Sequence, residues 1–340
     1  MAAPRYDESV HNSMCNIESR GGDVVNHPIK ASHGAVVNAR PRARSSAFMK
    51  SFHKHKYYYV LLLPGVIYFL LFKYIPMGGI AIAFQDFKIA GSVFDSPWVG
   101  LKWFRILFDS PDFWIALRNT VIISFYKLLF NFPAPIVLAL LLNELLNGVF
   151  KRIVQTIIYF PHFVSWVVLG SILFSVFSVD TGVAKLLGLS SSPLMNPEVF
   201  RGFLVGSEMW KEVGWGTVIY LAAIAGVNPE LYEAARIDGA NRFQLVRHVT
   251  LPSIASTIVV LLILRTGQIL NVGFDQIYIL YNPLVYNVAD TLDTYVYRVG
   301  LTMGRFPFAT AAGLFQSVVG LCLLLFTNWL VRRMGERGLW

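Results

Sequence analysis

A set of polar side chains recurs at helical spacing inside an otherwise apolar run. Its members are Arg265, Gln268, Asn271 and Asp275. At about 100° per residue they project onto one helix face about 120° wide. A charged group inside a membrane normally faces water or a partner, because exposing it to lipid is costly. The pattern therefore predicts a polar translocation path that contacts a hydrophilic substrate, or a structural pair between Arg265 and an acid on a neighbouring helix.

A second patterned segment, residues 228–252, is polar and lies between two apolar runs. Asn228 followed by proline is typical of a helix start. Gly239 favours the left-handed conformation that ends a helix, and Asn241 can cap a second helix that Pro252 closes. This hairpin fits the groove of another protein, or rests on lipid headgroups through its arginines. The two predicted helices are 229–238 and 242–251.

Several single residues could contact a substrate, and each has a structural alternative. Lys127 is a cation within an apolar run that could serve an anionic substrate or extend to the interface. Trp166 and Trp215 could stack on a ring of the substrate or contact lipid. Asn131 precedes two prolines that interrupt its run, which indicates either a cavity wall or a packing kink.

The sequence offers little for catalysis or metal binding. His162 and His248 have no metal-ligand spacing, and the chain has no phosphate-binding G-x-x-x-x-G-K-[ST] motif, so ATP would have to be bound by another subunit. Asp290 and Asp293 form an acidic pair near an interface, and we interpret them as polar contacts for a docking protein. We therefore expect no catalytic residues, no bound metal and no cofactor of the chain's own.

Composition identifies the class of element that positions these residues. Of 340 residues, 55% are hydrophobic and 14% charged, and the mean hydropathy is +0.54. This predicts an all-α polytopic membrane protein. Since a helix crosses the bilayer in about 20 residues, six apolar runs are predicted to span it. They lie near 57–84, 118–142, 153–177, 203–227, 253–276 and 308–331.

Charge distribution predicts the orientation. If both termini are cytoplasmic, most of the 29 Lys and Arg residues lie in cytoplasmic segments, as the positive-inside rule requires. Residues 1–56 are basic and poor in large apolar groups, so we expect a disordered cytoplasmic tail rather than a secretory signal. Residues 57–340 are then the transmembrane domain, with 228–252 as its largest cytoplasmic loop.

The polar loop carries a family resemblance. Glu-Ala-Ala, a glycine six residues after the glutamate, and Leu-Pro near position 20 resemble the EAA loop of ATP-binding-cassette importer permeases. The matching residues are Glu233, Ala234, Ala235, Gly239, Leu251 and Pro252. Val249 stands where the family commonly has isoleucine. The resemblance implies a type I importer permease fold in which this loop is the coupling helix that docks on an ATPase subunit.

A narrower resemblance covers most of residues 57–340. "LPGVIYFLLFKYIPMGGIAIAFQDF", "GQILNVGFDQIYILYNP" and "DTYVYRVGL" resemble the polysaccharide and oligosaccharide branch of these permeases. The branch implies a sugar substrate, with an acidic, alginate-like chain as the first candidate. It also implies a bacterial inner-membrane location, a second homologous permease, two ATPase subunits and an external sugar-binding protein, with no nucleic acid.

Two other classes of function compete with this reading. A membrane-embedded glycan-processing enzyme would need clustered carboxylates or histidines, for which Asp290 and Asp293 are the nearest candidates. A stand-alone secondary transporter normally carries inverted repeats within one chain, and six runs without an obvious repeat argue against it.

Overall fold

The computed structural model describes residues 55–88, 91–92, 94–178, 182–186, 188, 192–333 and 335. The chain divides into two compact units, residues 1–64 and 65–340. Of the first unit only residues 55–64 are described, and they include the start of helix α2. The predicted disordered tail therefore lies almost entirely outside the described residues.

Helices make up the regular structure of the described residues, and an isolated bridge joins Gln85 to Trp98. The N-terminal helices are α2 (Lys56–Phe69), η1 (Leu70–Tyr74), α3 (Ile75–Met77), η2 (Gly78–Phe84), α4 (Lys102–Phe108), α5 (Pro111–Asn131), α6 (Pro133–Asn143), α7 (Gly148–Tyr159), η3 (Phe160–Phe163), α8 (Trp166–Val176) and α9 (Val183–Leu186). The C-terminal helices are α10 (Pro197–Ala225), α11 (Pro229–Ile237), α12 (Arg242–Leu245), η4 (Val246–Thr250), α13 (Leu251–Ser253), α14 (Ala255–Gly267), α15 (Phe274–Leu280), α16 (Tyr286–Ala289), α17 (Leu292–Tyr297), η5 (Arg298–Thr302) and α18 (Phe306–Arg333).

Three described helical runs are long and apolar enough to cross a membrane: Lys56–Phe84, Pro111–Asn143 and Phe306–Arg333. Two bent pairs raise the number among the described residues to as many as five if each pair is one span. Helix α10 is 29 residues long but carries Glu208, Lys211 and Glu212 within it. The prediction of a mostly helical protein is confirmed. Helix α10, which contains the fourth predicted span, is not among the helices counted as apolar enough to cross a membrane.

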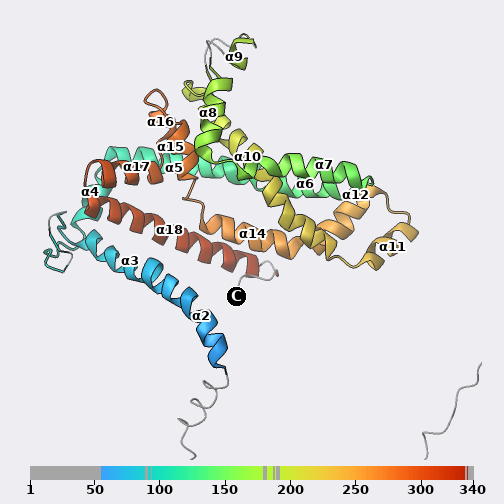
Figure 1. The fold of residues 1–340 in the computed structure, drawn as a ribbon, viewed down its shortest axis with the longest axis horizontal. Helices are drawn as coiled ribbons and strands as arrows, with labels where there is room; N and C mark the ends of the chain where they lie inside the picture. The colour runs from blue at the N-terminus through green and yellow to red at the C-terminus, as the bar shows by residue number, and fades with distance from the viewer. Residues whose placement is uncertain are drawn as a thin grey trace, which may run out of the picture. The chain divides into compact units, whose positions relative to one another are not determined.

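Helix α10 is the element around which the second unit is packed. It lies against α5, α6 and α7, while α14 lies against α18 (Figure 1). Its buried Phe200 and Leu204 belong to one apolar cluster, and its Tyr220 and Ile224 belong to another. Gly214 allows the close crossing with α7, because a Cβ atom there would lie 2.2 Å from the carbonyl oxygen of Ile158.

Two of the predicted spans contain a break in the helix. The run predicted over 153–177 bends by 102° between η3 and α8. Pro161 lies in the short η3 turn, and the Ser165 side chain then caps α8 by accepting from the Val168 N–H. The run predicted over 253–276 ends as helix α14 at Gly267, and α15 begins only at Phe274.

The second helix of the polar loop ends close to its prediction. Helices α12, η4 and α13 form one helical run to Ser253, two residues beyond the predicted end at 251. The Leu251 N–H bonds to the Val246 carbonyl, five residues back, which widens the helix by a π turn just before the proline. The run bends by 61° from α14, and Pro252 lies one residue before it ends.

Candidate functional site

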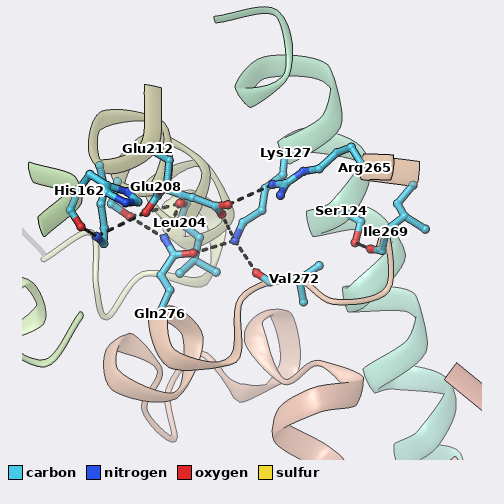
Figure 2. Close-up of polar contacts among 12 residues, drawn as sticks. Ser124, Lys127, His162, Leu204, Glu208, Glu212, Arg265, Ile269, Val272 and Gln276 are labelled. Carbon is cyan, nitrogen blue, oxygen red and sulfur yellow. Dashed lines mark hydrogen bonds and ion pairs between the residues drawn. The ribbon is translucent and has the colours of Figure 1, made fainter. Parts of the chain in front are cut away.

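Three charged residues from three helices form the ion cluster: Lys127 of α5, Glu208 of α10 and Arg265 of α14. The Lys127 Nζ pairs with Glu208 Oε2, and the Arg265 Nη2 lies 3.2 Å from Glu208 Oε1 (Figure 2). Lys127 is buried and Glu208 nearly so, whereas 44% of the Arg265 side chain is exposed. The structural pair predicted for Arg265 is therefore present, and Lys127 does not extend to an interface.

Lys127 also holds the break in the fifth predicted span. Its ammonium donates to the Val272 carbonyl at 2.6 Å and to Gln276 Oε1 at 2.7 Å. Gln276 in turn donates to the Leu204 carbonyl at 2.7 Å, which connects α15 to α10 (Figure 2). Gly273 has φ 88°, a left-handed conformation that favours glycine. Backbone groups freed by the break thus find side-chain partners, as a broken membrane helix requires.

The same helix, α10, holds the break in the third predicted span. The Lys211 Nζ donates to the His162 carbonyl at 2.6 Å. Glu212 lies 2.8 Å from His162 Nδ1 (Figure 2). The His162 ring also stacks on Trp215, with ring centroids 4.5 Å apart. Glu208, Lys211 and Glu212 are spaced three and four residues apart and therefore lie on one helix face. One charged face of α10 thus connects to both breaks.

A cavity of about 390 Å³, here called the Glu208 cavity, lies beside this face. Its polar and aromatic lining residues include Asn131, Trp166, Glu208, Glu212, Trp215 and Arg265. Ligand pockets of about 300–1,000 Å³ are typically lined by aromatic groups with a few placed polar groups. Lys127 and Arg265 together face the single carboxylate of Glu208, so the three residues of the ion cluster carry one excess positive charge.

The predicted polar stripe is only partly brought together, because the helix that would align it ends at Gly267. Arg265 lines the Glu208 cavity, and Gln268 and Asn271 line a small pocket of about 10 Å³ shared with Arg265 and Lys127. The Asn271 side chain accepts from the Gln316 amide at 2.8 Å. Asp275 lies in the first turn of α15 and lines neither space. The single helical face predicted for the four residues is therefore wrong.

Asp290 and Asp293, the predicted acidic pair, make separate contacts within the chain. Asp290 bonds to Arg298 at 2.6 Å and accepts from Thr294 at 2.8 Å. Asp293 accepts from the Gln316 amide at 2.8 Å. Burial raises the pKa of Asp293, and the hydrogen bond from Gln316 opposes that rise. No group of three or more His, Cys, Asp or Glu side chains suited to a metal occurs in the described part of the chain.

The polar loop forms two capped helices. The Asn228 side chain accepts from the Glu230 N–H, and Asn241 forms a capping box with Gln244. Gly239 lies between them with φ 81°. Tyr232 bonds to Thr250 at 3.0 Å across the hairpin. Of the matching EAA residues, Glu233, Ala234 and Ala235 lie on α11, Gly239 lies at the turn, and Leu251 and Pro252 lie on α13.

Two large apolar side chains of this loop are exposed to solvent. Ile237 and Phe243 are 86% and 71% exposed, and Glu233 and Ala234 are also exposed. Large apolar side chains grouped beside a rigid turn are typical of a surface that contacts a partner.

Sequence reasoning missed the central role of α10. From the sequence, the charges of Glu208, Lys211 and Glu212 at the start of the fourth predicted span are expected to reach an interface. Their spacing on one helix face was the available signal for a different role. Their partners could not be identified from the sequence, because Lys127, Arg265 and His162 lie 49 to 81 residues away along the chain.

Apolar helices, a largely buried ion cluster beside a cavity and an exposed capped hairpin are features expected of a membrane permease. The chain belongs to the family described as the binding-protein-dependent transport system inner membrane component, whose model matches residues 131–336.

Two relatives from Bacillus subtilis (strain 168) cover nearly the same length. Protein LplB is 49% identical over 86% of this chain and 94% of its own. The polygalacturonan/rhamnogalacturonan transport system permease protein YteP is 48% identical over 84% of this chain and 91% of its own. Both similarities extend well beyond the polar loop, so the resemblance read from short motifs holds over most of the chain.

A solved structure has the same fold. It is a crystal structure of a bacterial ABC transporter involved in the import of the acidic polysaccharide alginate. The matched chain is 42% identical with a TM-score of 0.79, and the match covers 85% of this chain and 100% of that one. A second structure of a bacterial alginate transporter, in complex with an alginate-pentasaccharide-bound periplasmic protein, gives a TM-score of 0.78. The type I ABC permease fold is therefore shown, and the chain is a permease of a sugar importer.

Proposed function

We propose that this chain forms, with a second homologous permease, the translocation path of an ATP-driven importer for acidic oligosaccharides or polysaccharides. An external sugar-binding protein delivers the substrate, and two partner ATPase subunits bind the ATP. The chain itself binds no cofactor. The alginate transporter of similar fold and the polygalacturonan/rhamnogalacturonan permease support an acidic substrate class.

One observation carries the acidic preference: the unequal charges of the ion cluster. Glu208 neutralises the buried Lys127. Arg265 contacts Glu208 through one nitrogen only, at 3.2 Å, and its half-exposed side chain lines the Glu208 cavity. The remaining guanidinium N–H groups can donate to a carboxylate in a planar, two-pronged geometry. Gln268 and Asn271 extend this path with neutral groups, and Asp275 is retained as a proposed outer contact.

The polar loop is proposed to couple the path to ATP hydrolysis. Glu233, Ala234, Ala235, Gly239, Leu251 and Pro252 are the residues assigned to this role. The exposed Ile237 and Phe243 beside Gly239 supply apolar area for a cleft on the ATPase subunit. This assignment places the loop and both chain termini in the cytoplasm of a bacterial cell, with six spans in its inner membrane.

Changing Arg265 to glutamine tests the acidic path. We expect the complex to assemble, because Lys127 still neutralises Glu208. Uptake of a uronic-acid oligosaccharide into proteoliposomes should fall about 10-fold or more, since a hydrogen bond to a charged group contributes about 1.5–3 kcal/mol. Uptake of a neutral oligosaccharide of equal length should change little if the complex accepts one.

Arg265→Lys is the matched control, because it keeps the charge and loses only the planar fork. It should retain more acidic uptake than Arg265→Gln. Unchanged uptake of acidic sugars by a stable Arg265→Gln complex would contradict the proposed path. Failure of that variant to assemble would show that Arg265 is structural.

A further inference from the structure

The Glu208 cavity contains a polar side chain that the packing of this chain does not satisfy. Both the oxygen and the nitrogen of the Asn131 amide are shielded from solvent and have no hydrogen-bond partner. Asn131 ends α5, directly before the proline-containing start of α6, and it lines the cavity. A buried amide without partners is destabilising, so a ligand hydroxyl that reaches this amide through the cavity would gain hydrogen bonds that the chain itself does not supply.

Trp215 supplies an aromatic wall of the same cavity in a fixed orientation. The His162 ring lies parallel to it within 1°, and Glu212 holds that ring through its Nδ1 at 2.8 Å. His162 thereby covers one face of Trp215, while 47% of the Trp215 surface is exposed. A fixed, half-exposed indole is suited to contact a flat ligand, because little side-chain freedom is lost on binding.

Sugar rings match this combination of surfaces. The C–H face of a sugar ring is apolar and packs on an aromatic ring, while its hydroxyls need donors and acceptors such as an amide. A uronic acid adds a carboxylate, which the exposed guanidinium of Arg265 can bind at the same cavity. The cavity volume of about 390 Å³ lies within the usual range for ligand pockets.

We infer that the Glu208 cavity is a subsite for one uronic acid unit of the transported chain, with Asn131 hydrogen-bonding a ring hydroxyl and Trp215 packing against the ring. This inference rests on the proposed function, because it assigns the residues that select a sugar within that path. It makes Asn131 and Trp215 determinants of substrate binding, in addition to the charge contact of Arg265.

A direct binding measurement tests the subsite. The purified permease–ATPase complex, without the external binding protein, is titrated with a fluorescently labelled uronic-acid trisaccharide. We expect Asn131→Leu and Trp215→Leu each to raise the dissociation constant about 3- to 10-fold, the range expected for one lost hydrogen bond or a comparable contact. Asn131→Gln keeps the amide and should lie between Asn131→Leu and the unchanged chain.

Trp210→Leu is the matched control for Trp215→Leu. Trp210 is on the same helix and is similarly exposed, 52%, but it lines a separate apolar cavity. Trp210→Leu should bind the trisaccharide as the unchanged complex does. If Asn131→Leu does not assemble, the comparison of Trp215→Leu with Trp210→Leu still tests whether the Glu208 cavity is a sugar subsite.

The outcomes separate the subsite from the proposed function. If the unchanged complex imports uronic-acid oligosaccharides in proteoliposomes with its binding protein, but Trp215→Leu binds the trisaccharide like Trp210→Leu, the subsite is wrong and the function stands. The same conclusion follows if the importing complex shows no direct trisaccharide binding. If the unchanged complex imports no acidic oligosaccharide, the proposed function fails and the subsite fails with it.

Discussion

Replacing Glu208 with glutamine is expected to destabilise the assembled complex more than any other single change in the ion cluster. Lys127 is buried, with 3% of its side chain exposed, and Glu208 is the carboxylate that pairs with both it and Arg265. Breaking a buried ion pair by removing one partner costs about 3–5 kcal/mol, because the remaining charge is left uncompensated. The measurement is the thermal unfolding midpoint and the yield of the complex purified in detergent.

Glu212→Gln is the matched control for this change. Glu212 lies one helical turn further along α10 and lines the same cavity, but 41% of its side chain is exposed. Its loss should cost much less, since half-exposed ion pairs contribute about 0–1 kcal/mol. Adding Arg265→Gln to Glu208→Gln removes one of the two unbalanced cations and should recover part of the lost stability. Equal midpoints for Glu208→Gln and Glu212→Gln would refute a stabilising role for the ion cluster.

Features that depend on residues adjacent in the sequence could be predicted from the sequence. The capped start of α11 at Asn228 and the left-handed turn at Gly239 both occur as predicted. Each is decided by one or two side chains and the backbone beside them. Hydropathy likewise identified the apolar runs, because the composition of each run alone determines whether it is long and apolar enough.

The helix breaks were not predictable in the same way. Gln268 and Asn271 continue the helical spacing that starts at Arg265, so periodicity gave no signal that α14 ends at Gly267. The break is stabilised by Lys127, which donates to the Val272 carbonyl from a helix 145 residues away in the sequence. A backbone interrupted inside a membrane depends on such distant partners, and a single sequence does not reveal which residues meet.

Replacing Gly239 with valine is expected to uncouple transport from ATP hydrolysis while the helices of the second unit remain folded. Gly239 has φ 81°, and a β-branched residue is strained there by about 1–3 kcal/mol. A Cβ atom at this position would meet no other atom within 4 Å, so the effect arises from the backbone and not from crowding. The turn between α11 and α12 should then shift the exposed Ile237 and Phe243 that are proposed to contact the ATPase subunit.

The measurements are the amount of ATPase subunit that co-purifies with the permease and the rate of substrate uptake, and both should fall several-fold. Gly239→Asn should keep most of each, because asparagine tolerates the left-handed conformation better than valine does. Gly148→Val is the matched control: Gly148 also has open space around its Cβ position, but it lies at the start of α7 and is not among the glycines with positive φ. Normal ATPase association and normal uptake in Gly239→Val would show that the geometry of this turn does not matter, and the coupling role proposed for residues 228–252 would have to be abandoned.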